Sequence, residues 1–211
     1  MTYAEVRDAA LGLINQESIA GTPIPGTYNN QQDYLNKIPE LINAAQMDIA
    51  TTAKFIPEAA MLAELPYTDM GASRVYYLPS DMWQRRGSGL LVPAPERFDR
   101  GLRYKRFNQC QMLGRNKLIV PTKLPDETIL EYYRYPHRLS NPPDEQEELD
   151  NVPEVHAIIP YYVGAHLVMY DDAFLYASLY NTYEAKKAGL GELLTTEPSF
   201  VDDVFCFDFW G

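Results

Sequence analysis

Apolar residues recur with helical spacing in two stretches near the start of the chain. In the first stretch Val6, Ala10 and Leu13 share one face, and Thr2 and Glu5 have the spacing of a capping box. The second stretch, roughly residues 31–53, places five apolar residues on one face: Ile38, Ile42, Ala45, Ile49 and Ala53. We expect a helix from each stretch, with an irregular loop between them. In the second stretch we expect a break or kink at residues 37–38 and a longer helix that begins near Pro39.

Between residues 55 and 135 the pattern changes to that of short strands. Four segments are rich in β-branched and aromatic residues and are bounded by glycine, proline or asparagine, namely residues 72–78, 102–107, 117–120 and 128–135. We expect turns at 69–71, 114–116 and 125–126, and a single helical turn within 79–84. This part of the chain therefore predicts an inserted antiparallel β domain.

Helical spacing returns after Asn151, which is a suitable N-cap for a helix with Pro153 and Glu154 in its first turn. Because Pro160 lacks a backbone N–H, we expect this helix to bend there. A last helix is expected from Asp172 to about Lys187, ended by the glycines at 189 and 191.

These elements predict an α+β fold. Two amphipathic helices at each end of the chain cannot bury their apolar faces alone, so we expect them to form one antiparallel helical bundle. The expected domains are a bundle of residues 1–54 and 151–190, a β insertion with an acidic loop over 55–150, and an extended C-terminal tail over 191–211.

Composition narrows the classes of function. The 211 residues include 29 acidic and 18 basic side chains, which give a net charge of −11. This charge argues against tight binding of nucleic acid, but not against a surface past which DNA slides.

No stretch approaches the roughly 18 apolar residues of a membrane-spanning helix. The N-terminus also lacks the basic region of a cleaved secretory signal. Sixteen tyrosines favour subunit interfaces.

Candidate catalytic and metal-binding residues are sparse. His156 and His166 lie ten residues apart on one expected helix and are not expected to share a metal. The two cysteines, Cys110 and Cys206, cannot form a disulfide framework or a CxxC zinc site. Acid pairs such as Glu147–Glu148 are typical of a solvated surface, although a carboxylate hydrolase stays open as an alternative. We expect no catalytic residue, no metal and no cofactor.

Basic residues gather between positions 85 and 106 of this acidic chain: Arg85, Arg86, Arg97, Arg100, Arg103, Lys105 and Arg106. They could form an ordinary solvated surface, or a monomeric nucleic-acid-binding module with Trp83, Phe98 and Tyr104 as stacking residues. We favour a third interpretation, in which the run faces the acidic loop of a neighbouring copy in a closed ring. The predicted inter-subunit residues are Arg97, Arg100, Arg103, Arg106, Asp144, Glu145, Glu147 and Glu148.

Four segments resemble a known family. The run YLNKIPELINAAQMDIATTAKFIP (34–57) is similar to the signature helix of head–tail connector (adaptor) proteins of tailed bacteriophages. The segments YYLPSDMWQ (76–84), ILEYYRYPHRL (129–139) and PEVHAIIPYYVGAHLVMYDDAFLYASLYNTYEAK (153–186) resemble later blocks of the same family. The resemblance covers roughly residues 31–187 and rests on patterned helices and one loop motif.

The resemblance implies a structural virion protein, assembled in the host cytoplasm and located at the portal vertex or neck. Such adaptors form a dodecameric ring under the portal, extend the DNA channel and join the capsid to the tail. The partners implied are further copies of the chain, the portal protein, a tail, stopper or nozzle protein, and viral DNA that passes without sequence-specific binding. No membrane partner is expected.

The C-terminal tail, SFVDDVFCFDFWG, alternates aromatic and polar residues with the spacing of a strand. It could fold back as an edge strand on the β insertion of its own subunit. We hypothesise instead that it adds a strand to an exposed edge of the portal, with backbone hydrogen bonds for affinity and the aromatic face for specificity. The predicted portal-binding residues are Phe200, Val201, Val204, Phe205, Phe207, Phe209 and Trp210.

Overall fold

The structure is a computed structural model that describes residues 1–16, 28–86, 90–93, 104–121 and 124–194. Contacts within the chain divide it into two compact units. The helical unit comprises residues 1–49, 139–149 and 153–211, and the β unit comprises residues 50–138 and 150–152. Helices together with two antiparallel sheets confirm the α+β class.

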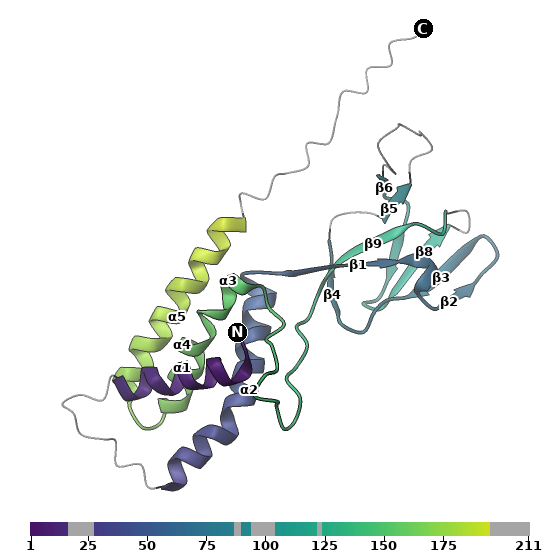
Figure 1. The fold of residues 1–211 in the computed structure, drawn as a ribbon. Coiled ribbons are helices and arrows are strands. Elements are labelled where there is room, and N and C mark those ends of the chain that lie inside the picture. Colours follow the sequence, from purple (N-terminus) through teal and green to yellow (C-terminus); the bar gives the residue numbers. More distant parts are fainter. Residues whose placement is uncertain (17–27, 87–89, 94–103, 122–123, 195–211) are drawn as a thin grey trace. The chain divides into compact units, whose positions relative to one another are not determined.

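The helical unit contains most of α2 (Tyr28–Thr52) together with α1 (Tyr3–Gln16), α3 (Pro153–His156), α4 (Ile159–Val168) and α5 (Ala173–Leu194) (Figure 1).

Side chains cap the first turns of two of these helices. Before α1, the predicted capping box is present: the Thr2 N–H donates to Glu5 Oε2 at 2.9 Å, and the Glu5 N–H donates to Thr2 Oγ1 at 3.3 Å. Before α5, Asp172 Oδ1 accepts hydrogen bonds from the N–H groups of Phe174 and Leu175 at 3.0 and 2.9 Å. Each cap satisfies backbone amides that have no partner inside the helix.

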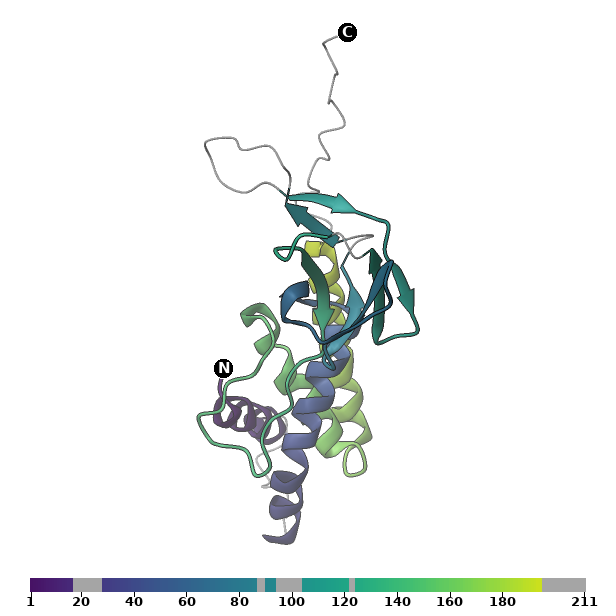
Figure 2. The same ribbon diagram turned by 90° about the vertical axis from the view of Figure 1, so that its right-hand side faces the viewer.

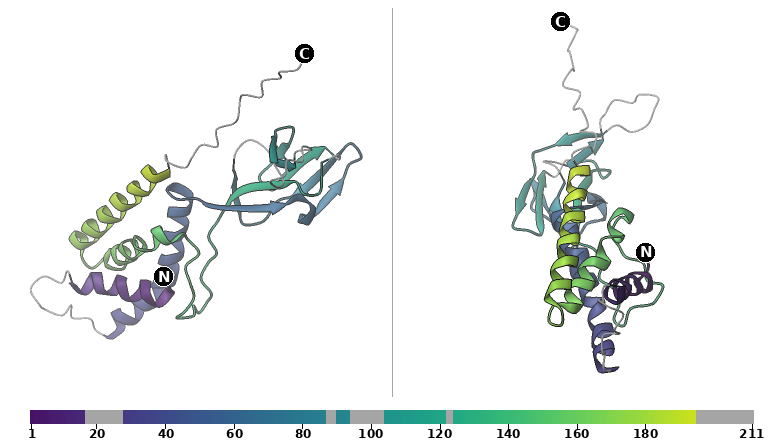
Figure 3. Two further views of the ribbon diagram at one scale, coloured as in Figure 1. Left: turned by 45° about the horizontal axis from the view of Figure 1, so that its top comes forward. Right: turned by 90° about the vertical axis from the view of Figure 1, so that its left-hand side faces the viewer.

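Helix α4 packs against both α1 and α5, and the two views of Figure 3 show α5 lying alongside α4. Gly164 allows the close approach, because a Cβ there would lie 3.5 Å from the Ala10 carbonyl oxygen and 3.4 Å from Leu179 Cδ1. The buried apolar side chains of the helical unit include Val6, Ala10, Ile14, Ile38, Ile42, Ala45, Ile49, Val163, Leu167, Leu175, Leu179 and Tyr183.

Three proline and glycine positions can be compared with the expectations for the helices. At Pro39 no break occurs, because burial of Ile38 and Ile42 on either side outweighs the loss of one backbone donor. The expected stop at Gly189 is wrong, since helix α5 continues to Leu194. Near Pro160, where a bend was expected, the structure has two separate helices, α3 ending at His156 and α4 beginning at Ile159.

Two antiparallel sheets make up the β unit (Figures 1 and 2). In the first sheet, β9 (Ile129–Arg134) pairs with β1 (Ile56–Met61) on one side and with β4 (Met82–Arg85) and β5 (Leu90–Pro93) on the other, and β6 (Tyr104–Phe107) follows β5. The second sheet has the order β2 (Tyr67–Asp69), β3 (Ser73–Tyr77), β8 (Lys117–Pro121) and β7 (Gln111–Leu113). A short 3₁₀ helix, Leu62–Glu64, follows β1.

One hydrophobic cluster joins the two sheets. Its buried members come from both sheets and from the segments between them: Leu62, Tyr76, Leu78, Leu90, Leu118, Val120, Leu130 and Tyr132. Burial of side chains of this size contributes about 1.5–3 kcal/mol each. The β unit therefore has a hydrophobic core of its own.

The strand predictions for β3, β8 and β9 are confirmed, and β6 matches the described part of residues 102–107. The predicted turns at Gly71 and Gly114 have φ values of 81° and 68°, which favour glycine. The helical turn expected within 79–84 is wrong, because Met82–Arg85 instead forms β4, which pairs with β9.

Arg134 on β9 binds Asp150, which lies just before α3. Its Nη2 atom donates to Asp150 Oδ1 at 2.8 Å, Nη1 donates to Asp150 Oδ2, and Nε lies 3.3 Å from Glu58 Oε2. Burial alone would raise the pKa of Asp150, but hydrogen bonds from Arg134 and from the His137 N–H hold that pKa below its ordinary value. This stabilisation is present above the ordinary pKa of an aspartate and is lost as the pH falls through the lowered value.

Candidate interaction surfaces

The acidic segment, defined as Leu139–Leu149, lies along the start of α1 within the helical unit. The Tyr3 N–H donates to the Glu147 carbonyl at 2.8 Å, and the Ala4 N–H donates to the Glu145 carbonyl at 3.2 Å. Thr2 forms a β-bridge with Glu148, and Arg7 Nη1 lies 2.5 Å from Glu145 Oε1. The acidic segment is therefore held by its own subunit through backbone and side-chain contacts.

Glu147 closes the acidic segment on itself. Its carboxylate accepts hydrogen bonds from the Ser140 N–H at 2.8 Å, from the Ser140 hydroxyl, and from the Asp144 N–H at 3.3 Å. The hydrogen bonds from Ser140, first from its side chain and then from its backbone, lower the pKa of Glu147. Glu145 and Glu147 thus have side-chain partners inside the subunit, and the side chain of Glu148 is exposed.

The basic run separates into parts with different environments. Arg97, Arg100 and Arg103 lie outside the described residues, whereas Lys105 and Arg106 are exposed on β6. The half-buried Arg85 directs Nη1 to Cys110 Sγ at 3.2 Å.

Two further members of the predicted nucleic-acid site pack within the β unit. The Arg86 guanidinium lies 5.9 Å from the Tyr133 ring centre, and Trp83 packs against Phe55 with ring centres 5.2 Å apart. Trp83 is half-buried, so part of its surface is already used for packing.

Aromatic side chains from α4 and α5 pack together inside the helical unit. Tyr162 stacks on His166 with ring centres 4.0 Å apart, and Tyr183 meets Tyr162 edge-on at 5.0 Å. Tyr176 and Tyr180 stack at 5.6 Å and contact His166 with their edges. Because His166 Nδ1 lies 2.9 Å from the Tyr162 carbonyl oxygen, which can only accept, Nδ1 carries the proton. These tyrosines serve internal packing.

The hollows on the described part of the β unit include one of about 350 Å³ and one of about 750 Å³. The smaller is lined mainly by uncharged residues of β3, β7 and β8, and the larger by residues that include Trp83, Arg85 and Arg115. Across the described part of the chain, no three histidine, cysteine or acidic side chains come close enough to hold a metal ion. The helices described here are also too short or too polar to cross a membrane.

Charge is divided unequally between the two units. Counted over the sequence, the helical unit has four basic and nineteen acidic side chains, a net charge of −15. The β unit has fourteen basic and ten acidic side chains, a net charge of +4. The two units therefore carry net charges of opposite sign.

Comparison with known proteins identifies the family. The sequence profile described as SU10 adaptor protein matches residues 1–201. The chain belongs to the SU10 adaptor protein family. This match confirms the resemblance to phage head–tail adaptors and extends it over both units. No curated protein matches the sequence.

Membership of the SU10 adaptor family makes the chain a structural adaptor protein of a bacteriophage and a component of the virion. The family is structural, which argues against the hydrolase alternative. It also points to association with portal and tail proteins and with further copies of the chain.

The predicted portal-binding residues of the C-terminal tail, Phe200–Trp210, lie outside the described residues. Three exposed side chains lie at the turn between α4 and α5 and were not predicted from the sequence: Met169, Tyr170 and Phe174. The pair of acids at 171–172 is the feature of the sequence that indicates this turn. The pair lies between two helices, and Asp172 caps the second, so the flanking aromatic residues lie at the turn.

Proposed function

We propose that the chain forms a ring of twelve copies that docks under the portal, extends the DNA channel and joins the capsid to the tail. The observation that carries this proposal is the match of the SU10 adaptor family over residues 1–201. The net charge of −11 on each copy supports it, because like charge keeps DNA from adhering to the wall of a channel.

The isolated protein is expected to bind duplex DNA only weakly, with a dissociation constant above the micromolar range at physiological salt. The physical reason is the net charge of −11, which repels the phosphate backbone. Fluorescence anisotropy with labelled duplex, repeated at several salt concentrations, measures the affinity. Sub-micromolar, salt-dependent binding would instead favour a nucleic-acid-binding module built on the basic run.

Neighbouring copies in the ring are proposed to meet partly through charge. Arg97, Arg100, Arg103 and Arg106 of one copy would face the acidic segment of the next, where the exposed Glu148 is best placed to respond. Reversing Arg106 to glutamate is expected to weaken each interface by about 1 kcal/mol. Closure of a ring multiplies that cost over many interfaces.

The control is Lys37→Glu, an equal change of charge at an exposed position of α2. Sedimentation velocity at low salt should show reduced assembly for Arg106→Glu and normal assembly for Lys37→Glu. Adding Glu148→Lys to Arg106→Glu should partly restore the ring. Glu147 is unsuitable for this rescue, because its carboxylate closes the acidic segment. Normal assembly of Arg106→Glu would remove this contact from the proposal.

A further inference from the structure

The turn between α4 and α5 presents an exposed apolar tip, here called the α4–α5 tip and defined as residues 169–174. Tyr170 is 89% exposed, Phe174 77% and Met169 42%. Single exposed apolar side chains are ordinary, but three of them within six residues make a patch that water solvates poorly. Asp171 and Asp172 lie between them and give the tip a negative charge.

Hydrogen bonds hold the α4–α5 tip in one conformation. The N–H groups of Asp171 and Asp172 both donate to the Val168 carbonyl, at 3.0 and 2.9 Å. The Tyr34 hydroxyl donates to the Asp171 carboxylate, and burial together with this hydrogen bond raises the pKa of Tyr34 to about 12. A tip that is already ordered loses little conformational entropy when it binds.

The sheet β2–β3–β8–β7 has an apolar outer face. Its register pairs Tyr76 with Leu118 and Leu118 with Met112, and these side chains pack in the core of the β unit. Residues one position away must point to the opposite face. That outer face carries Val75, Tyr77, Leu113, Lys117 and Ile119.

Exposure and charge vary over this outer face. Leu113 is 52% exposed and Tyr77 40% exposed, whereas Val75 is only 7% exposed. The charge on the face is positive: Lys117 Nζ lies 5.2 Å from the centre of the Tyr77 ring, and Arg115 is exposed in the adjoining turn. The face therefore combines apolar area with a charge opposite to that of the α4–α5 tip.

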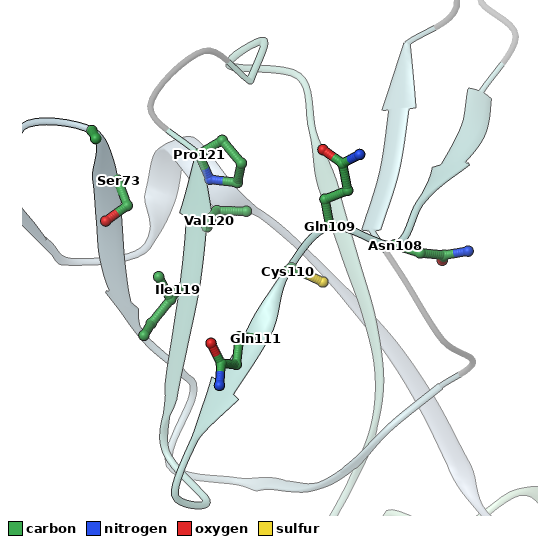
Figure 4. A pocket seen from close by; sticks show the side chains of 9 residues that line it. Ser73, Asn108, Gln109, Cys110, Gln111, Ile119, Val120 and Pro121 are labelled. Atoms are coloured by element: carbon green, nitrogen blue, oxygen red, sulfur yellow. The ribbon is translucent and has the colours of Figure 1, made fainter.

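The hollow of about 350 Å³ opens on the same outer face. The hollow is lined by residues at outer-face positions on three neighbouring strands: Ser73, Gln111 and Ile119. Figure 4 shows their side chains around the hollow. Lined in this way by uncharged side chains, the hollow can receive an aromatic anchor without burying an unpaired charge.

We propose that the α4–α5 tip of one copy docks on the outer face of the β2–β3–β8–β7 sheet of a second copy, with Tyr170 or Phe174 in the hollow. This inference rests on the ring of the proposed function and names surfaces that build it. The occupant is a second copy because the tip is acidic, the outer face is basic, and every copy carries both. A contact between two different patches is heterologous, and repetition of a heterologous contact closes a ring.

The contact can be tested with variants at exposed positions, which are expected to fold. The tip variant is Tyr170→Ser with Phe174→Ser, and the face variant is Leu113→Asp. The matched control is Met61→Ser, which alters an equally exposed apolar residue on the other sheet, at 48% exposure. For cross-linking, full-length protein at high concentration carries a photo-activated cross-linking residue in place of Phe174.

We expect cross-links to β3, β7 or β8 of a second copy, identified by mass spectrometry. Leu113→Asp should reduce the yield of these cross-linked dimers about tenfold, as loss of an interface anchor does, and Met61→Ser should leave it unchanged. Mixing the tip variant with the face variant should give dimers and nothing larger, because only one intact pair of patches remains.

Several results would overturn the inference: no cross-link, a cross-link within one chain, a cross-link to another element of the second copy, or assemblies larger than dimers in the mixture. None of them bears on the proposed function, which fails separately if no ring forms on the portal.

Discussion

Replacement of Tyr183 with alanine is expected to lower the free energy of unfolding of the helical unit by about 3–5 kcal/mol, as for other large buried aromatic residues. Tyr183 on α5 is completely buried, and its hydroxyl donates to the Asp48 carboxylate on α2. Lys187 joins the same carboxylate at 2.8 Å and also contacts Glu184 at 2.9 Å. The substitution would leave a cavity and remove the hydrogen bond that Tyr183 donates to Asp48.

The matched control is Tyr183→Phe, which keeps the ring and removes only the hydroxyl. It should cost about 1–2 kcal/mol, because a hydrogen bond to a charged carboxylate is lost while Lys187 still pairs with Asp48. Urea unfolding followed by circular dichroism at a helix-sensitive wavelength measures both variants. Equal losses for alanine and phenylalanine would show that the hydroxyl, and not the packing of the ring, joins α2 to α5.

A chain shortened to end at Pro198 is expected to lose co-purification with the portal while its thermal unfolding temperature changes little. The lost segment carries the predicted portal-binding residues Phe200–Trp210. A strand added to an edge of the portal would contribute backbone hydrogen bonds, and repetition around a ring would convert a weak contact into a strong one.

Two full-length variants separate the contributions of the C-terminal tail. Replacing Phe205, Phe207, Phe209 and Trp210 with serine should abolish portal binding, whereas replacing Asp202, Asp203 and Asp208 with asparagine should retain it. A shortened chain that loses stability but still binds the portal would show that the tail belongs to its own subunit.

Features encoded locally in the sequence were predictable. The Thr2–Glu5 capping box and the turns at Gly71 and Gly114 depend on residues a few positions apart, and the structure confirms them. The effect of Pro160 is only partly predictable: proline removes a backbone donor wherever it stands, but the expected bend is replaced by two separate helices, α3 and α4. Pro39 shows the limit of this reasoning, since burial of Ile38 and Ile42 keeps α2 continuous there.

Features that depend on distant partners were not predictable from the pattern. Strand β1 contains Pro57 and Glu58 and does not alternate, yet it pairs along the whole of β9. The acidic segment has the composition of a solvated loop. In the structure, however, Glu145 forms a salt bridge with Arg7, and Glu147 accepts a hydrogen bond from the Ser140 N–H. The outer face of the second sheet depends on the register of β3, β7 and β8, which no single strand reveals.

The most direct test of the ring is the number of copies that bind one portal. The purified full-length protein can be mixed with portal assemblies, and the mass of the complex measured by native mass spectrometry or mass photometry. Twelve copies on each portal, with no complex formed by the chain that ends at Pro198, is the expected result. A protein that remains monomeric beside the portal and binds duplex DNA tightly in a salt-dependent manner would contradict the proposal.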